Sequence, residues 1–122
     1  MTSRLDYCNS LLAGIPVALL QKLQRVQKAA ARVITKTAKY EHISPVLMEL
    51  HWLPVEMRIQ YKILLYTHKA IHGDSPQYIK DLVKVKAPTR SLRSSSAIQL
   101  CMPHTNTRTY GDRSFRTAAA TL

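Results

Sequence analysis

Five cations recur at intervals of three or four residues in one stretch of the chain: Lys22, Arg25, Lys28, Arg32 and Lys36. On a helix this spacing brings the five side chains onto one face, which we call the cationic stripe. No acidic residue lies within it. Lysine and arginine in such a row contact backbone phosphates, so the stripe predicts nucleic-acid binding without base recognition. A merely solvated helix face is the simpler alternative, because exposed lysine and arginine are common.

A second group of cations lies toward the C-terminus, where Arg90 and Arg93 stand in a serine-rich segment. From Lys84 onward the only acidic residue is Asp112. This composition is typical of an arm that becomes ordered on a polyanion. We therefore expect a nucleic acid as the partner, with Arg90 and Arg93 as secondary contacts.

Catalytic and metal-binding patterns are weak by comparison. The acidic residues are scattered singly, whereas phosphoryl transfer needs clustered carboxylates to hold divalent metals. His68 and His72 stand four residues apart, but no third ligand accompanies them, so a metal-free pair on a helix is the expectation. Residues 110–113 have the outline of a polymerase aspartate turn with only one carboxylate, which predicts an ordinary turn or helix cap. We expect no enzyme activity and no cofactor.

Composition limits the class of protein. The chain has 122 residues, with 18 Lys and Arg against 7 Asp and Glu, and this formal charge of +11 favours polyanionic partners. Its hydrophobic content of 46% suffices for one folded domain. Cys8 and Cys101 lack the spacing of a zinc site or a disulfide scaffold. Because no signal segment or membrane span is recognisable, we expect an intracellular protein, nuclear or cytoplasmic, without a membrane partner.

The stripe needs a long helix to position it, and residues 17–37 supply one. Their apolar side chains keep helical spacing with no glycine or proline. A second long amphipathic helix is predicted over residues 55–72, with Gly73 as its stop. Shorter helices are predicted at three further places: Ser3 to Gly14, after Ser44-Pro45, and after Ser75-Pro76.

These elements predict a mainly α fold, a small bundle of four to five helices over residues 1–84. Residues 85–122 are expected to form a basic tail, extended or disordered, with a short strand at 98–102 and a terminal helix after Arg108. Trp52, placed between leucines, is expected to close the core between helices rather than to stack on bases.

Several stretches of the sequence resemble the region that follows the polymerase domain in reverse transcriptases of LINE-type (non-LTR) retrotransposons. They are SRLDYCNSLLAGIP (residues 3–16), LQRVQKAAARVIT (23–35), HWLPV (51–55), YKILLYTHKAIHGDSPQYIKDLV (61–83), APTRSLRSS (87–95) and TYGDRSFRTAA (109–119). Their order and separation match as well, and together they cover nearly the whole chain.

The resemblance implies a thumb-like helical region located after the fingers and palm. In that family the metal-binding aspartates lie upstream, so this chain is expected to be a non-catalytic fragment of an RNA-directed DNA polymerase. The resemblance also implies that the nucleic-acid partner is RNA or an RNA/DNA hybrid. The missing fingers-palm part is then a further expected partner, and the surface that would pack on it is expected to be apolar and exposed.

Two alternatives stay open at this stage. The chain could be a helical protein-interaction module whose charge is incidental, or a relic without selected activity. The sequence leaves open the oligomeric state and the preference for RNA or DNA.

Overall fold

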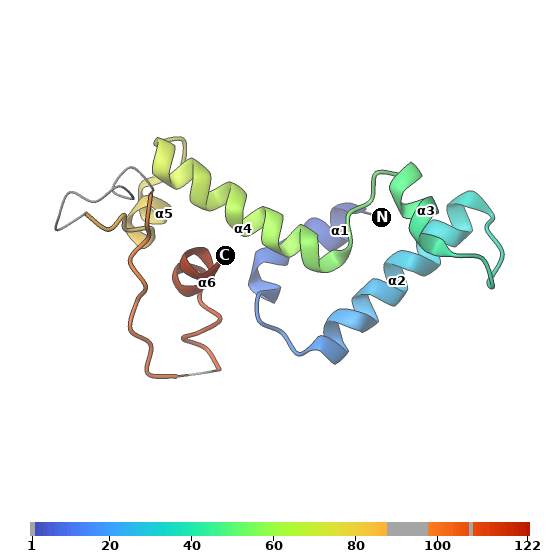
Figure 1. Ribbon diagram of the computed structural model, residues 1–122, viewed down its shortest axis with the longest axis horizontal. Helices are drawn as coiled ribbons and strands as arrows, with labels where there is room; N and C mark the ends of the chain where they lie inside the picture. The colour runs from blue at the N-terminus through green and yellow to red at the C-terminus, as the bar shows by residue number, and fades with distance from the viewer. Residues whose placement is uncertain (1, 88–97, 108) are drawn as a thin grey trace. The chain divides into compact units, whose positions relative to one another are not determined.

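The computed structural model describes residues 2–87, 98–107 and 109–122, and within these ranges the protein is mainly helical, as predicted (Figure 1). The helices in chain order are α1 (Thr2–Asp6), α2 (Val17–Thr35), α3 (Ile43–Glu49), α4 (Val55–His72), α5 (Gln77–Leu82) and α6 (Phe115–Thr121), with a 3₁₀ turn at Asn9–Leu12. The chain divides into two compact units, Met1–Ile59 and Gln60–Leu122. The boundary expected after residue 84 rests on composition and stays a prediction.

The core of the first unit lies where α3 packs against the C-terminal half of α2 (Figure 1). Ala31 on α2 is buried together with Ile43 and Leu47 of α3. Trp52 packs against this cluster, which confirms its predicted place in the core. A small residue at position 31 lets the branched side chains of α3 approach the backbone of α2, because ridges on one helix fill the grooves of the other.

Two glutamines on the inner side of α2 fix the turn that precedes α4. Gln27 is fully buried, and its Nε2 donates a hydrogen bond of 2.7 Å to the carbonyl oxygen of Leu53. Its Oε1 accepts from Nε2 of Gln24 at 2.7 Å. Gln24 in turn accepts at Oε1 from the backbone N–H of Val55 at 2.9 Å, which satisfies one of the free donors in the first turn of α4. We call Gln24 and Gln27 the glutamine latch.

A salt bridge joins α1 to the start of α4. Nη1 of Arg58 lies 2.9 Å from each carboxylate oxygen of Asp6, and Nε of Arg58 donates to the Leu53 carbonyl at 2.9 Å.

The single short helix predicted from Ser3 is divided into α1 and the 3₁₀ turn, because Cys8 between them takes a left-handed conformation (φ 51°). The left-handed conformation ends the α-helical hydrogen bonding.

Helices α2, α3 and α4 end in the same way. A left-handed residue follows the last turn of each, namely Lys36 (φ 54°), His51 (φ 52°) and Gly73 (φ 89°). The next N–H then bonds to a carbonyl five residues back: Thr37 to Arg32, Trp52 to Leu47, and Asp74 to Lys69. This is the Schellman arrangement, which satisfies carbonyls at a helix end. The predicted stop at Gly73 is confirmed, whereas α2 ends at Thr35, two residues earlier than predicted.

The second unit contains most of α4, followed by α5 and α6. Ile63 is almost fully buried on α4, with Thr67 and Ala70 on the same side of the helix. Val85 and Leu100 form one isolated antiparallel bridge, so the strand expected at residues 98–102 is not present among the described residues. The terminal helix expected after Arg108 is confirmed over the shorter range Phe115–Thr121.

Candidate nucleic-acid interface

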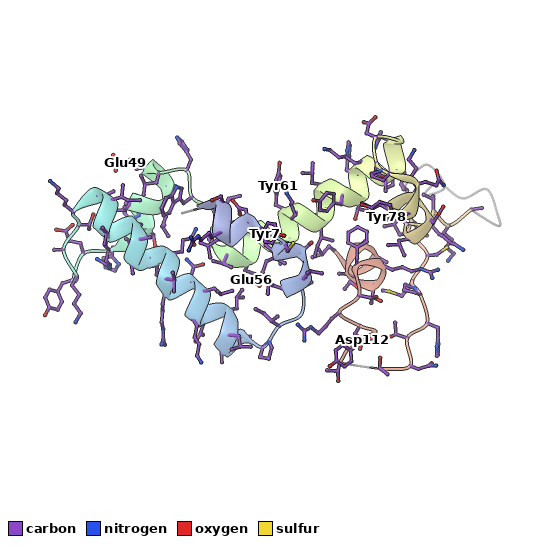
Figure 2. All side chains as sticks on the ribbon, turned by 180° about the vertical axis from the view of Figure 1, so that it is seen from behind. Tyr7, Glu49, Glu56, Tyr61, Tyr78 and Asp112 are labelled. Carbon is purple, nitrogen blue, oxygen red and sulfur yellow. The ribbon has the colours of Figure 1, made fainter. Side chains whose placement is uncertain are left out.

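The cationic stripe lies on α2, opposite the residues that hold α2 in the first unit. The buried residues of α2 are Gln27, Ala30 and Ala31, whereas Lys22, Arg25 and Lys28 are exposed. Figure 2 shows side chains projecting from α2 on the side away from α3. Helix α2 contains no Asp or Glu, so no carboxylate of its own neutralises these three cations. They form an uninterrupted positive row of the kind that contacts successive phosphates.

Arg32 has a structural role that its place in the sequence does not reveal. Its side chain is half-buried, and its guanidinium donates hydrogen bonds to the carbonyl oxygens of Ala38 and, at 2.9 Å, of Glu41. These bonds close the loop between α2 and α3. The donors used in this way are unavailable to a phosphate, so Arg32 contributes charge to the stripe more than contact.

Lys36 lies just outside α2, at the left-handed position that ends the helix. It is exposed, but its side chain no longer follows the helical spacing that defined the stripe. Lys22, Arg25 and Lys28 therefore form a continuous row on α2. Arg32 also closes a loop, and Lys36 lies beyond the end of the helix.

The second predicted group, Arg90 and Arg93, lies outside the described residues. In the described part of the same region, Lys84 and Lys86 are exposed on either side of Val85. Backbone hydrogen bonds fix this short segment: Lys86 N–H donates to the Gln99 carbonyl at 2.7 Å, and Cys101 N–H donates to the Lys84 carbonyl at 2.8 Å.

The glutamine latch is the feature that sequence reasoning missed. It positions α2 against the turn at Leu53 and so determines which face of α2 is turned outward. The signal available in the sequence was two glutamines three residues apart within an otherwise apolar face. A polar side chain in that place is unfavourable unless it finds hydrogen-bond partners, which Leu53 and Val55 provide.

Other titratable and nucleophilic side chains lie outside the cationic stripe. The rings of His68 and His72 stack with centroids 4.0 Å apart on the exposed side of α4, and Nδ1 of His72 lies 2.9 Å from the His68 carbonyl oxygen. Within the described residues, no three His, Cys, Asp or Glu side chains gather as a metal site would require. Asp112 lies in a turn, as predicted, and accepts a hydrogen bond from the Thr105 hydroxyl. Cys8 and Cys101 are free thiols.

None of the described helices combines the length and apolar character needed to cross a membrane. No protein-family model matches this chain, and neither a curated protein nor a solved structure matches it significantly. The resemblance to LINE-type reverse transcriptases therefore stays a prediction from the sequence motifs, and so does the partner that it implies.

Proposed function

We propose that this chain is a non-catalytic module that binds RNA or an RNA/DNA duplex through backbone phosphates, as a segment of a reverse transcriptase-like protein. The observation that carries the proposal is the exposed, acid-free row of Lys22, Arg25 and Lys28 on a helix whose inner face is fixed in a core. A preformed helix keeps the backbone positions of the cations at constant separation, so that little backbone order must be created on binding.

Contacts of this kind do not read sequence, because they reach phosphates and not base edges. With Lys22, Arg25, Lys28 and the neighbouring Lys36 each contacting a phosphate, the logarithm of affinity is expected to fall with the logarithm of salt concentration at a slope of about −3 to −4. Duplexes of equal length and different sequence are expected to bind equally.

The test is a fluorescence-anisotropy titration of the whole chain against a short labelled RNA/DNA hybrid at several salt concentrations. In the double variant Arg25→Gln/Lys28→Gln, two phosphate contacts are removed. The salt slope is expected to become shallower by about 2, with an affinity loss of up to about a hundredfold at 0.1 M salt.

The matched control is Arg4→Gln/Lys69→Gln, which removes the same total charge from two exposed side chains outside α2. Its salt slope is expected to change by much less, because these cations are not in a row. Equal losses in the two double variants would show that only net charge matters and would remove the stripe from the proposal. Circular dichroism on each preparation checks that helicity is unchanged.

A further inference from the structure

The outer face of α2 carries large apolar side chains beside the cationic stripe. Leu19, Val26 and Val33 recur every seven residues, and their exposed fractions are 48%, 49% and 79%. Seven residues make two helical turns, so the three side chains lie along one line of the helix. We call them the apolar row. Exposed apolar residues that are aligned on one face indicate a binding surface, unlike those scattered singly.

Charge decides what kind of surface can cover the apolar row. Lys22 lies between Leu19 and Val26 along the helix, and Arg25 is adjacent to Val26 in the sequence. In all, α2 carries four cations and no acidic residue. Any partner that covers the row also approaches these cations and removes water from them, which is costly unless carboxylates pair with them. The partner must therefore be acidic.

The described helices of this chain do not supply such carboxylates. A second copy of α2 packed on the first would bring two cationic stripes together, and like charges repel. Each of the other described helices contains at most one acidic residue: Asp6 in α1, Glu49 in α3, Glu56 in α4 and Asp81 in α5, with none in α6. Charge complementarity thus points to a different molecule.

The spacing of the apolar row indicates a helical partner. A repeat of seven residues keeps one position of each heptad on the seam between two helices, and the second seam position falls here on Lys22 and Ala29. Membrane-surface helices place aromatic and leucine side chains on their apolar face, and α2 has no aromatic residue. A nucleic acid would contact the stripe but would offer the row no apolar seam.

We propose that the outer face of α2 docks an acidic amphipathic helix of another protein. The apolar seam of that helix covers Leu19, Val26 and Val33, and its flanking Glu or Asp side chains pair with Lys22 and Arg25. The interface spans about two heptads, which is short for a helix pair, so a weak and reversible complex is expected. This inference does not depend on nucleic-acid binding, although both partners would compete for the stripe.

The probe is a fluorescent synthetic helix of three heptads, with Leu or Ile at the two seam positions of each heptad and Glu at the flanking positions. The control peptide has the same composition in an order without the seven-residue repeat. The intact chain is expected to bind the patterned peptide at least roughly tenfold more tightly than the control peptide, because only the patterned helix gathers its apolar side chains on one face.

Variants of the chain separate the apolar row from the stripe. Val26→Ser/Val33→Ser is expected to weaken binding of the patterned peptide roughly tenfold or more, and to change binding of the RNA/DNA hybrid less than about twofold. The matched control, Val17→Ser/Ile34→Ser, alters two exposed apolar residues of α2 outside the row, with exposed fractions of 67% and 55%, and is expected to leave both affinities nearly unchanged.

Three results would overturn the proposal. The first is equal binding of the two peptides, which would reduce the effect to general attraction of polyanions. The second is a loss of peptide binding no larger in Val26→Ser/Val33→Ser than in the control variant. The third is a dimer in analytical ultracentrifugation that depends on Val26 and Val33, which would assign the row to a second copy. Nucleic-acid binding can succeed or fail independently of all three.

Discussion

Helices α2 and α4 have nearly equal lengths, 19 and 18 residues, yet they use their large apolar side chains in opposite ways. Helix α4 buries Val55 and Ile63 almost completely. Helix α2 buries Gln27 and Ala31 and leaves Val33 exposed. Helix α4 is held by buried apolar area, whereas α2 is held by small residues and buried hydrogen bonds. Leu19, Val26 and Val33 of α2 stay exposed, and they form the surface that we propose for a partner.

Truncation of a buried apolar side chain of α4 is expected to cause the largest loss of stability. Replacing Ile63 by Ala removes a side chain that is only 1% exposed, and both lost burial and the resulting cavity destabilise the fold. We expect the free energy of unfolding to fall by about 3 to 4 kcal/mol in urea titrations followed by circular dichroism. Leu64→Ala, on the exposed side of α4, is the control and is expected to cost about 1 kcal/mol or less. Similar losses in the two variants would contradict the assigned burial.

The glutamine latch gives the next largest effect. Gln27→Ala leaves the Gln24 amide without its partner, removes one of the two hydrogen bonds to the Leu53 carbonyl and opens a small cavity, so we expect the free energy of unfolding to fall by about 2 kcal/mol. Gln21→Ala changes an exposed glutamine of the same helix and serves as the control. We expect it to change the free energy of unfolding by no more than about 0.5 kcal/mol. If Gln27→Leu, which keeps most of the volume, were as stable as the wild type, hydrogen bonding would not be what holds α2.

The ends of the two helices allow a paired test with opposite signs. A Cβ at Gly73 would meet no atom within 4 Å, so Gly73→Ala adds only the strain of a left-handed residue, and we expect a loss of about 1 kcal/mol. Lys36→Gly relieves that strain at the end of α2, and we expect it to raise the free energy of unfolding by up to about 1 kcal/mol. Thermal unfolding of both variants measures the two shifts. Shifts of the same sign would mean that the two ends are not equivalent.

Substitution of an exposed valine on the outer face of α2 is expected to change stability least. Val33→Ser is expected to change the free energy of unfolding by about 0.5 kcal/mol or less, because the side chain is 79% exposed. The same urea titration measures it. A loss comparable to that of Ile63→Ala would show that Val33 is covered within the folded chain and would leave the apolar row without a place for a partner.

Much of the helical architecture could be predicted from the sequence. Helix α4 spans the predicted residues 55–72, and α2 begins at the predicted Val17. These helices have a long apolar repeat without glycine or proline, which is the strongest local signal of a helix. The division at Cys8 could not be predicted, because an exposed cysteine is not a typical left-handed residue.

The candidate site was predictable in part. Spacing alone identified Lys22, Arg25 and Lys28 as one face, and these residues are exposed. Leu19, Val26 and Val33 are among the apolar side chains that keep helical spacing over residues 17–37, and all three are exposed. A helical repeat specifies which residues share a face, but the packing of neighbouring elements decides which part of a broad apolar face is covered.

The helical repeats, the stop at Gly73 and the excess of positive charge follow from local stereochemistry or from composition, so they can be predicted from the residues alone. The inward orientation of Gln24 and Gln27 and the closing of a loop by Arg32 depend on tertiary contacts. Those contacts involve carbonyl and amide groups up to 31 residues away along the chain, which no local pattern specifies.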